Sequence, residues 1–151
     1  HDLSHQLHPS KLEQLGLVAA IRGLCHELTH SHGLMIEFKD HQIPAAISPD
    51  TAMCLYRIAQ EGLRNAVKHS GAQRAEVELS GAAETISLRI IDDGTGFDPR
   101  SIQGKGGLGL VSIRARVLHL GGEIAIDSQP SAGTRIEVRV PVTEPSETPT
   151  E

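Results

Sequence analysis

The residues best suited to chemistry lie in two glycine-rich segments, and the first of these follows a predicted strand. This first segment is Asp92-Asp-Gly-Thr-Gly96, which predicts a sharp turn with a carboxylate at its edge. Glycines at such a turn permit backbone angles and close approaches that a Cβ would forbid. The Asp92 carboxylate can accept a hydrogen bond from an exocyclic amine such as that of adenine. The segment therefore predicts one wall of a binding pocket.

The second glycine cluster, residues 104–110, runs into a helical pattern. Backbone N–H groups at a helix start can hold phosphates, and the groups in position here belong to Gly106, Gly107, Leu108 and Gly109. The cluster is not a P-loop, because Lys105 is followed by glycine rather than by Ser or Thr. It is not a dinucleotide fingerprint either, since the strands before it form a hairpin rather than a βαβ unit.

A helix predicted over residues 49–70 carries the remaining polar candidates. Ser48-Pro49-Asp50 marks its start with a capping hydroxyl, a proline at the first helical position and an early acid. Gly71 stands just past its end. Apolar residues cluster on one side of the helix: Leu55, Ile58, Ala59, Leu63 and Ala66. Polar residues follow one flank of that side: Glu61, Asn65, Lys68 and His69.

This polar flank offers the groups that a nucleotide triphosphate needs. Asn65 has an amide oxygen, a ligand type that suits the Mg²⁺ accompanying triphosphates. Glu61, one turn earlier, could orient or deprotonate a nucleophile, and Lys68 could balance phosphate charge. Taken alone, Glu61 with Asn65 is more often a solvated helix face, and Asp92 to Gly96 is as often only a hairpin turn. Their combination in this order indicates a nucleotide pocket.

The elements that must position these residues are three helices and five strands. Helices are predicted over residues 12–30, 49–70 and 110–120, and strands over 34–38, 75–79, 85–91, 123–127 and 134–140, with a turn at 81–83. The hairpins are apolar on one face and polar on the other. This pattern predicts a two-layer α/β sandwich, with a mixed, mostly antiparallel sheet and helices on one face.

Composition sets further bounds. The chain has 151 residues, enough for one domain with a short appendage, and its 2% aromatic content requires an aliphatic core. The net charge of -5 argues against a nucleic-acid partner. Cys25 and Cys54 lie in apolar, helix-like runs, which predicts buried thiols in a reducing compartment. The nine histidines lack a companion cysteine or acid cluster, so a histidine metal site is not favoured.

Four segments, in this order, resemble the nucleotide-binding boxes of the GHKL (Bergerat-fold) ATPases. Tyr56 to His69 resembles the N box, Asp92 to Phe97 the first glycine box and Gly104 to Leu110 the second. Gly133-Thr134 resembles the threonine-bearing box on the following hairpin. The phrase from Ser4 to Leu17 resembles the join between dimerisation helices and ATP-binding domain in sensor histidine kinases that pair with LuxR/NarL-type response regulators. The resemblance extends over nearly all of residues 1–142.

The resemblance implies the Bergerat fold, ATP and Mg²⁺ as cofactors, and transfer of the γ-phosphoryl to a histidine. Asp92 would bind the adenine amino group, Asn65 would ligate Mg²⁺ and Glu61 would activate the attacking group. The other matching residues would surround the nucleotide: Lys68 and His69 near the phosphates, Gly94 and Gly96 at the adenine end, Gly106, Gly107, Leu108 and Gly109 in the lid, and Thr134 on the adenine side.

The resemblance also implies boundaries and partners. Residues 1–16 would end the second dimerisation helix and form a linker, 17–142 would be the catalytic domain, and 143–151, composed only of Pro, Glu, Thr and Ser, a disordered tail. His1-Asp2-Leu3 imitates an acceptor motif but lies only seven residues before His8, so we expect the acceptor histidine to be missing. The expected partners are the parent's own dimerisation helices and a response regulator. We expect a cytoplasmic, monomeric fragment of a homodimeric parent, which an inner-membrane anchor could hold.

Two other classes stay open at this point. One is a GHKL protein of another kind, such as an anti-sigma serine kinase or a mismatch-repair or chaperone-type ATPase. The short lid between Gly96 and Gly104 counts against the latter two. The other class is a binding module that kept the fold and lost catalysis, against which stands the full set of candidate residues: Glu61, Asn65, Asp92, Gly107 and Gly109.

Overall fold

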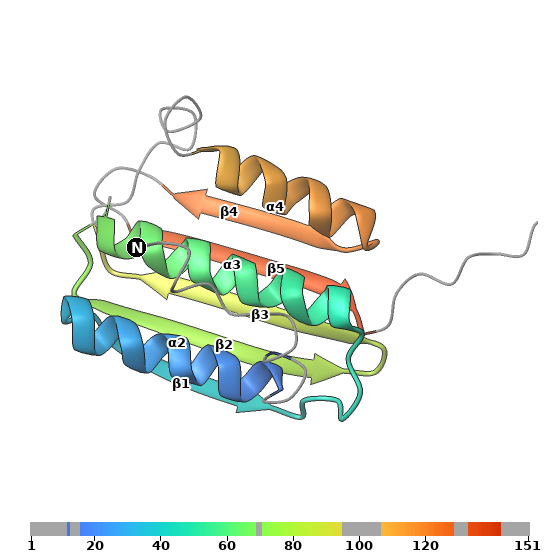
Figure 1. Cartoon of the computed structure of the whole chain (residues 1–151). Helices are drawn as coiled ribbons and strands as arrows, with labels where there is room; N and C mark the ends of the chain where they lie inside the picture. The colour runs from blue at the N-terminus through green and yellow to red at the C-terminus, as the bar shows by residue number, and fades with distance from the viewer. Residues whose placement is uncertain (1–11, 13–15, 69–70, 95–106, 129–132, 143–151) are drawn as a thin grey trace, which may run out of the picture.

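The structure is a computed structural model, and it describes residues 12, 16–68, 71–94, 107–128 and 133–142, without the side chains of 107–111. The elements, labelled as in Figure 1, are α2 (Leu17–His32), β1 (Met35–His41), α3 (Pro49–Lys68), β2 (Arg74–Ala82), β3 (Thr85–Asp92), α4 (Gly107–His119), β4 (Glu123–Ser128) and β5 (Thr134–Pro141). Most of residues 1–16, where the end of a dimerisation helix and a linker are expected, and the expected tail at 143–151 lie outside the described residues.

The strands form one mixed sheet in the order β1-β2-β3-β5-β4. β1 and β2 are parallel, and the other three neighbouring pairs are antiparallel. Figure 1 shows α2, α3 and α4 lying together over one face of this sheet. The predicted two-layer α/β sandwich is therefore confirmed.

The sheet alternates strictly between a face that meets the helices and an open face. Side chains facing the helices are aliphatic and buried, among them Val77, Leu79, Ile86, Leu88, Ile90, Ile136, Val138 and Val140. The open face carries charges that pair across strands, as Arg89 does with Glu78 at 2.9 Å and Arg139 with Glu123 at 2.7 Å. This alternation fixes the strand register, because a slip of one residue would turn every aliphatic side chain to water.

Helix α3 is the most deeply packed helix, and its sequence explains how it begins and where it lies. Ser48 Oγ accepts a hydrogen bond from the Thr51 N–H at 3.2 Å, which caps one of the unpaired donors at the helix start. The predicted apolar stripe is buried against the sheet, with Leu55, Ala59 and Leu63 fully inaccessible. Gly62 lets the helix approach closely, since a Cβ there would lie 3.0 Å from Ile136 Cδ1.

Several predicted boundaries are wrong, among them the end of β1, which continues to His41 rather than stopping at residue 38. The helix expected over residues 12–30 is interrupted at Gly16, whose φ of 83° cannot continue a right-handed helix, and α2 begins at Leu17. β2 continues through Gly81 and Ala82, so the turn expected at 81–83 lies at residues 83 and 84, where Ala83 has a φ of 49°. α4 begins at Gly107, inside the glycine cluster, rather than at Leu110.

The buried-thiol prediction is confirmed: Cys25 and Cys54 are both free and buried. Burial raises the pKa of each thiol to about 11, so neither is a reactive thiolate at neutral pH. Within the part of the chain that the structure describes, no helix has the length and apolar character needed to cross a membrane.

Candidate functional site

A row of three polar side chains crosses neighbouring strands at one end of the sheet. Asp92 ends β3, Thr134 begins β5 and Ser128 ends β4, and the register places Thr134 directly opposite both of the others. All three face the helices and are buried, with exposed fractions of 6%, 6% and 8%. The surrounding positions on this face are aliphatic. Buried polar groups require hydrogen-bond partners, and a bound ligand can be one of them. We therefore take this row as the base of a candidate binding site.

The Asp92 carboxylate is held by the turn that follows it. Its Oδ1 accepts a hydrogen bond from the Gly94 N–H at 2.9 Å, which fixes the side chain at the strand end. The structure thus places Gly94 directly beside Asp92. Gly96, the other glycine predicted for this end of the pocket, lies outside the described residues.

Gly133 brings the β5 strand against the backbone of Asp92. Its φ is +76°, a left-handed conformation, and a Cβ at this position would overlap the backbone oxygen of Asp92. Both constraints require glycine. The structure therefore explains why glycine precedes threonine here. Gly133 permits the close approach of β5 to the backbone of Asp92, and Thr134 places a hydroxyl next to the carboxylate in the row.

Helix α3 carries the predicted amide toward this row. Gly62 packs over Ile90 and Ile136, which precede Asp92 and follow Thr134 by two residues on the same face. In Figure 1, α3 and β3 run in the same direction, so Asn65 lies one turn further toward the polar row. The Asn65 side chain is buried, at 7% exposed, and its Nδ2 has no hydrogen-bond partner among the described residues. An unpaired buried amide is costly and suits a site that a ligand completes.

Two further predicted residues flank Asn65 along α3. Glu61 is half-buried one turn before it, and Lys68, the last residue of the helix, is exposed. Their spacing of four and three residues puts all of these side chains on one flank of the helix. His69 lies outside the described residues.

The last residues of the glycine cluster form the start of α4, which begins at Gly107. Gly107, Leu108 and Gly109 form the first turn of this helix, and Gly106 lies just before the described part. The first N–H groups of a helix have no partner within it and carry partial positive charge, so they can bind an anion. In Figure 1 this end of α4 lies on the same side of the molecule as the ends of β3 and α3.

Asp93 and Ser128 are two residues at this end that the predictions missed. Asp93 Oδ1 accepts hydrogen bonds from the N–H groups of Gln73 and Arg74, each at 3.0 Å. These bonds lower the pKa of the Asp93 carboxyl, and the bond from Arg74 has the larger effect. They also join the start of β2 to the end of β3. The sequence around neither residue indicates a special role, since a serine at a strand end and a second acid in a turn are both common. Their hydrogen-bond partners can be identified only once the pairing of the strands is known.

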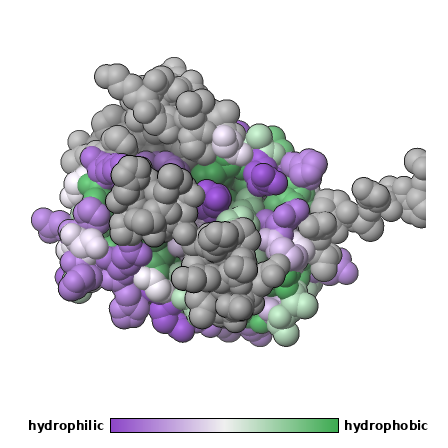
Figure 2. Space-filling view, viewed as in Figure 1, coloured by the Kyte–Doolittle hydropathy of each residue, from purple (hydrophilic) through white to green (hydrophobic). Residues whose placement is uncertain are grey.

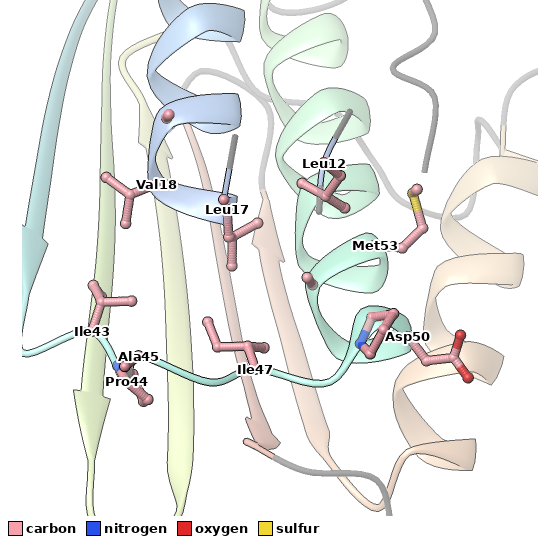
Figure 3. A pocket seen from close by; sticks show the side chains of 13 residues that line it. Leu12, Leu17, Val18, Ile43, Pro44, Ala45, Ile47, Asp50 and Met53 are labelled. Carbon is pink, nitrogen blue, oxygen red and sulfur yellow. The ribbon is translucent and has the colours of Figure 1, made fainter. Parts of the chain in front are cut away.

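A separate apolar cavity of about 500 Å³ lies at the other end of the domain, where α2 and α3 begin (Figure 3). None of the predicted site residues lines it. Its walls are mostly apolar side chains, including Leu12, Leu17, Ile43, Ile47 and Met53. Asp50 is the charged residue in its lining, and the buried polar row of Asp92, Thr134 and Ser128 does not reach it, so this cavity is separate from the candidate site.

Comparison with known proteins agrees with this geometry. The family model described as "Histidine kinase-, DNA gyrase B-, and HSP90-like ATPase" matches residues 50–144. Sensor histidine kinase MctS of Rhizobium johnstonii is 32% identical over 141 residues, which cover 92% of this chain and 30% of the relative. The signal transduction histidine-protein kinase/phosphatase UhpB of Salmonella typhimurium is 36% identical over 137 residues, which cover 90% of this chain and 27% of the relative. The chain thus spans less than a third of these curated relatives.

Solved structures share the fold. The histidine kinase domain of a blue-light activated histidine kinase from Erythrobacter litoralis superposes with a TM-score of 0.65 at 23% identity, covering 83% of this chain and 65% of that one. The mycobacterial sensor histidine kinase MprB superposes with a TM-score of 0.60 at 23% identity, covering 83% of this chain and 93% of that one.

Proposed function

Because this chain belongs to the family of histidine kinase-, DNA gyrase B- and HSP90-like ATPases, we propose that it is the ATP-binding catalytic domain of a sensor histidine kinase. In this proposal residues 17–142 bind ATP and transfer its γ-phosphoryl to a histidine on a dimerisation helix of the parent kinase. A response regulator of the LuxR/NarL type then receives the phosphoryl group. We place the domain in the cytoplasm, where ATP is available.

The observation that carries the proposal is the buried Asp92 carboxylate at the end of β3, held by the Gly94 N–H and set against Thr134. A buried carboxylate that accepts hydrogen bonds suits the exocyclic amine of adenine, because each group supplies what the other lacks. Gly133 lets β5 lie close against the backbone of Asp92, and we assign Gly94, Gly96 and Thr134 to the same adenine end.

The residues on α3 fit a magnesium-bound triphosphate. The buried amide of Asn65 has an Nδ2 without a partner among the described residues, and its oxygen is a ligand type that Mg²⁺ accepts. Asn65 would hold the ion, which would neutralise charge on the phosphates. Lys68, at the exposed end of the same helix flank, would add positive charge, together with His69. The N–H groups of residues 106–109 would bind phosphate oxygens at the start of α4.

Phosphoryl transfer then requires little covalent chemistry from the domain. An imidazole nitrogen of the acceptor histidine forms a bond to the γ-phosphorus, the bond from that phosphorus to the bridging oxygen breaks, and ADP leaves. Glu61, half-buried one turn from Asn65, would accept the imidazole proton. Catalysis is mainly positioning and charge neutralisation, as in other phosphoryl transfers.

Calorimetric titration with a non-hydrolysable ATP analogue, with and without Mg²⁺, tests this proposal. We expect binding that strengthens with Mg²⁺ and falls roughly ten- to a hundredfold in Asp92→Asn, which sets an amide donor against the adenine amine. Asp127→Asn is the matched control, because this acid neighbours Ser128 but is exposed on the open face of the sheet. Equal affinity in Asp92→Asn and the unmutated chain would refute the adenine assignment. In a phosphorylation assay with ATP, an acid-stable phosphoprotein product would favour a serine kinase.

A further inference from the structure

Ser128 occupies the outer end of the buried polar row, and its hydroxyl contacts Thr134. The two oxygens, Ser128 Oγ and Thr134 Oγ1, lie 2.8 Å apart, and both residues are buried. Nothing in the sequence distinguishes Ser128 from an ordinary strand-end serine. The register nevertheless places it directly opposite Thr134, which in turn stands opposite Asp92.

This contact constrains the proton of the Thr134 hydroxyl. A hydroxyl has one proton to donate and two lone pairs to accept with. If Ser128 donates to Thr134 Oγ1, the Thr134 proton is turned away from Ser128 and is available to a group lying over the row. Hydrogen bonds in such a chain also strengthen one another in a low-dielectric interior.

The edge of adenine matches a donor placed beside an acceptor. The exocyclic amine donates, and the ring nitrogen next to it accepts. When ionised, the Asp92 carboxylate can only accept hydrogen bonds, so it suits the amine, and the neighbouring ring nitrogen then requires a donor. Thr134 stands directly opposite Asp92 in the row and carries a hydroxyl that can supply one.

We propose that Ser128 is a positioning residue of the adenine pocket: its hydroxyl donates to Thr134 Oγ1 and so directs the Thr134 proton toward the ring nitrogen beside the amine that Asp92 binds. This inference rests on the proposed function, because it assigns the row to a nucleobase. It adds that adenine recognition extends over three strands, β3, β5 and β4, and depends on a residue that does not itself contact the base.

Calorimetry with ADP and 1-deaza-ADP tests the inference. The second ligand keeps the amine but has a C–H in place of the ring nitrogen. We expect the unmutated chain to prefer ADP roughly two- to tenfold, the value of one neutral hydrogen bond. Ser128→Ala should lower the affinity for ADP by most of that factor and leave 1-deaza-ADP unchanged, so that the preference disappears. Ser128→Thr keeps a hydroxyl and should retain the preference.

Two further variants sharpen the test. Thr134→Val should remove the preference as well, and adding Ser128→Ala to it should cause no further loss, because both changes break one chain of hydrogen bonds. Ser87→Ala is the matched control, a serine on the open face of β3. Thermal unfolding of each variant reports whether it folds.

The outcomes separate this inference from the proposed function. Equal weakening of both ligands in Ser128→Ala would show a merely structural role and overturn the inference. An unmutated chain that binds both ligands equally would also overturn it, even if no variant folded. An unmutated chain that binds neither ligand would overturn the proposed function, and the inference with it.

Discussion

At the scale of single residues, the site depends on places where a side chain is absent. Gly133 lies so close to Asp92 that a Cβ would overlap its backbone oxygen. The backbone position of Asp92 is therefore set partly by its neighbour on β5. A change at Gly133 should consequently act on the adenine pocket without touching any polar group in it.

We predict that Gly133→Ala lowers the free energy of unfolding by about 2–4 kcal/mol, from left-handed strain and overpacking together. Because the clash is with the strand that carries Asp92, affinity for an ATP analogue should fall at least roughly tenfold. Chemical denaturation and calorimetry measure the two effects.

Gly71→Ala is the control for the strain alone. Gly71 has a similar φ of +60°, but a Cβ there would meet nothing within 4 Å. We expect it to cost about 1–2 kcal/mol and to leave the nucleotide affinity unchanged. Equal losses of affinity in the two variants would show that the close approach to Asp92 has no part in binding.

The sequence predicts the site residues better than it predicts what holds them. Asp92 and Asn65 could be named because a turn acid and a helix-flank amide each leave a local pattern, and Thr134 because the Gly133-Thr134 pair resembles a box of a known family. The structure brings all three to one end of the sheet. Ser128 and Asp93 could not, because the bonds to Thr134 and to Gln73 and Arg74 depend on pairing between strands far apart in the sequence.

At the scale of elements, α3 is the piece that links the site to the rest of the fold. The start of α3, which is the end away from the site, is held to β5 by a chain of hydrogen bonds that runs through hydroxyl groups. Ser48 Oγ donates to Thr51 Oγ1 at 2.9 Å, and Thr51 Oγ1 donates to the Pro141 carbonyl at 3.3 Å. The Ser48 N–H also donates to the Val142 carbonyl at 3.1 Å. The helix that carries Glu61 and Asn65 is thus anchored at its start, away from the site.

We predict that Ser48→Ala lowers the free energy of unfolding by about 1 kcal/mol, the typical value of a lost helix cap. Nucleotide affinity should stay the same, since the cap lies at the end of α3 opposite Asn65. Ser48→Asn supplies another capping acceptor and should recover most of the stability. A drop in affinity with unchanged stability, measured by calorimetry and denaturation, would contradict this anchoring role.

Element boundaries followed local chemistry where that chemistry was unambiguous. The triplet Ser48-Pro49-Asp50 marks the start of α3 correctly, because capping and proline geometry act within one turn. Gly16 carries no local signal of a break, since a glycine within an apolar helical pattern is usually tolerated, although its φ is 83° in the structure. The parallel pairing of β1 with β2 likewise has no local signal.

At the scale of the whole molecule, the two faces of the sheet have different tasks. The helix-covered face holds the aliphatic core and, at one end, the polar row. The open face is covered with charges that pair with one another across strands. Figure 2, viewed from the helix side, shows polar and apolar residues interspersed on the described surface. The large, strongly exposed hydrophobic side chains within the described part are Met35 and Leu118, at 60% and 63% exposure.

These two side chains do not form a common patch, because Met35 belongs to the edge strand β1 and Leu118 to α4, which covers β4 at the opposite edge. Stable homodimers bury a larger, continuous and more apolar surface than isolated side chains provide. We therefore predict that this chain is a monomer in solution, with a light-scattering mass near 16.2 kDa at micromolar concentration. Under the proposed function, dimerisation of a parent kinase would then depend on helices outside residues 17–142. A mass near twice that value would place a dimer contact on the catalytic domain itself, and the mass of Leu118→Glu would then show whether α4 forms it.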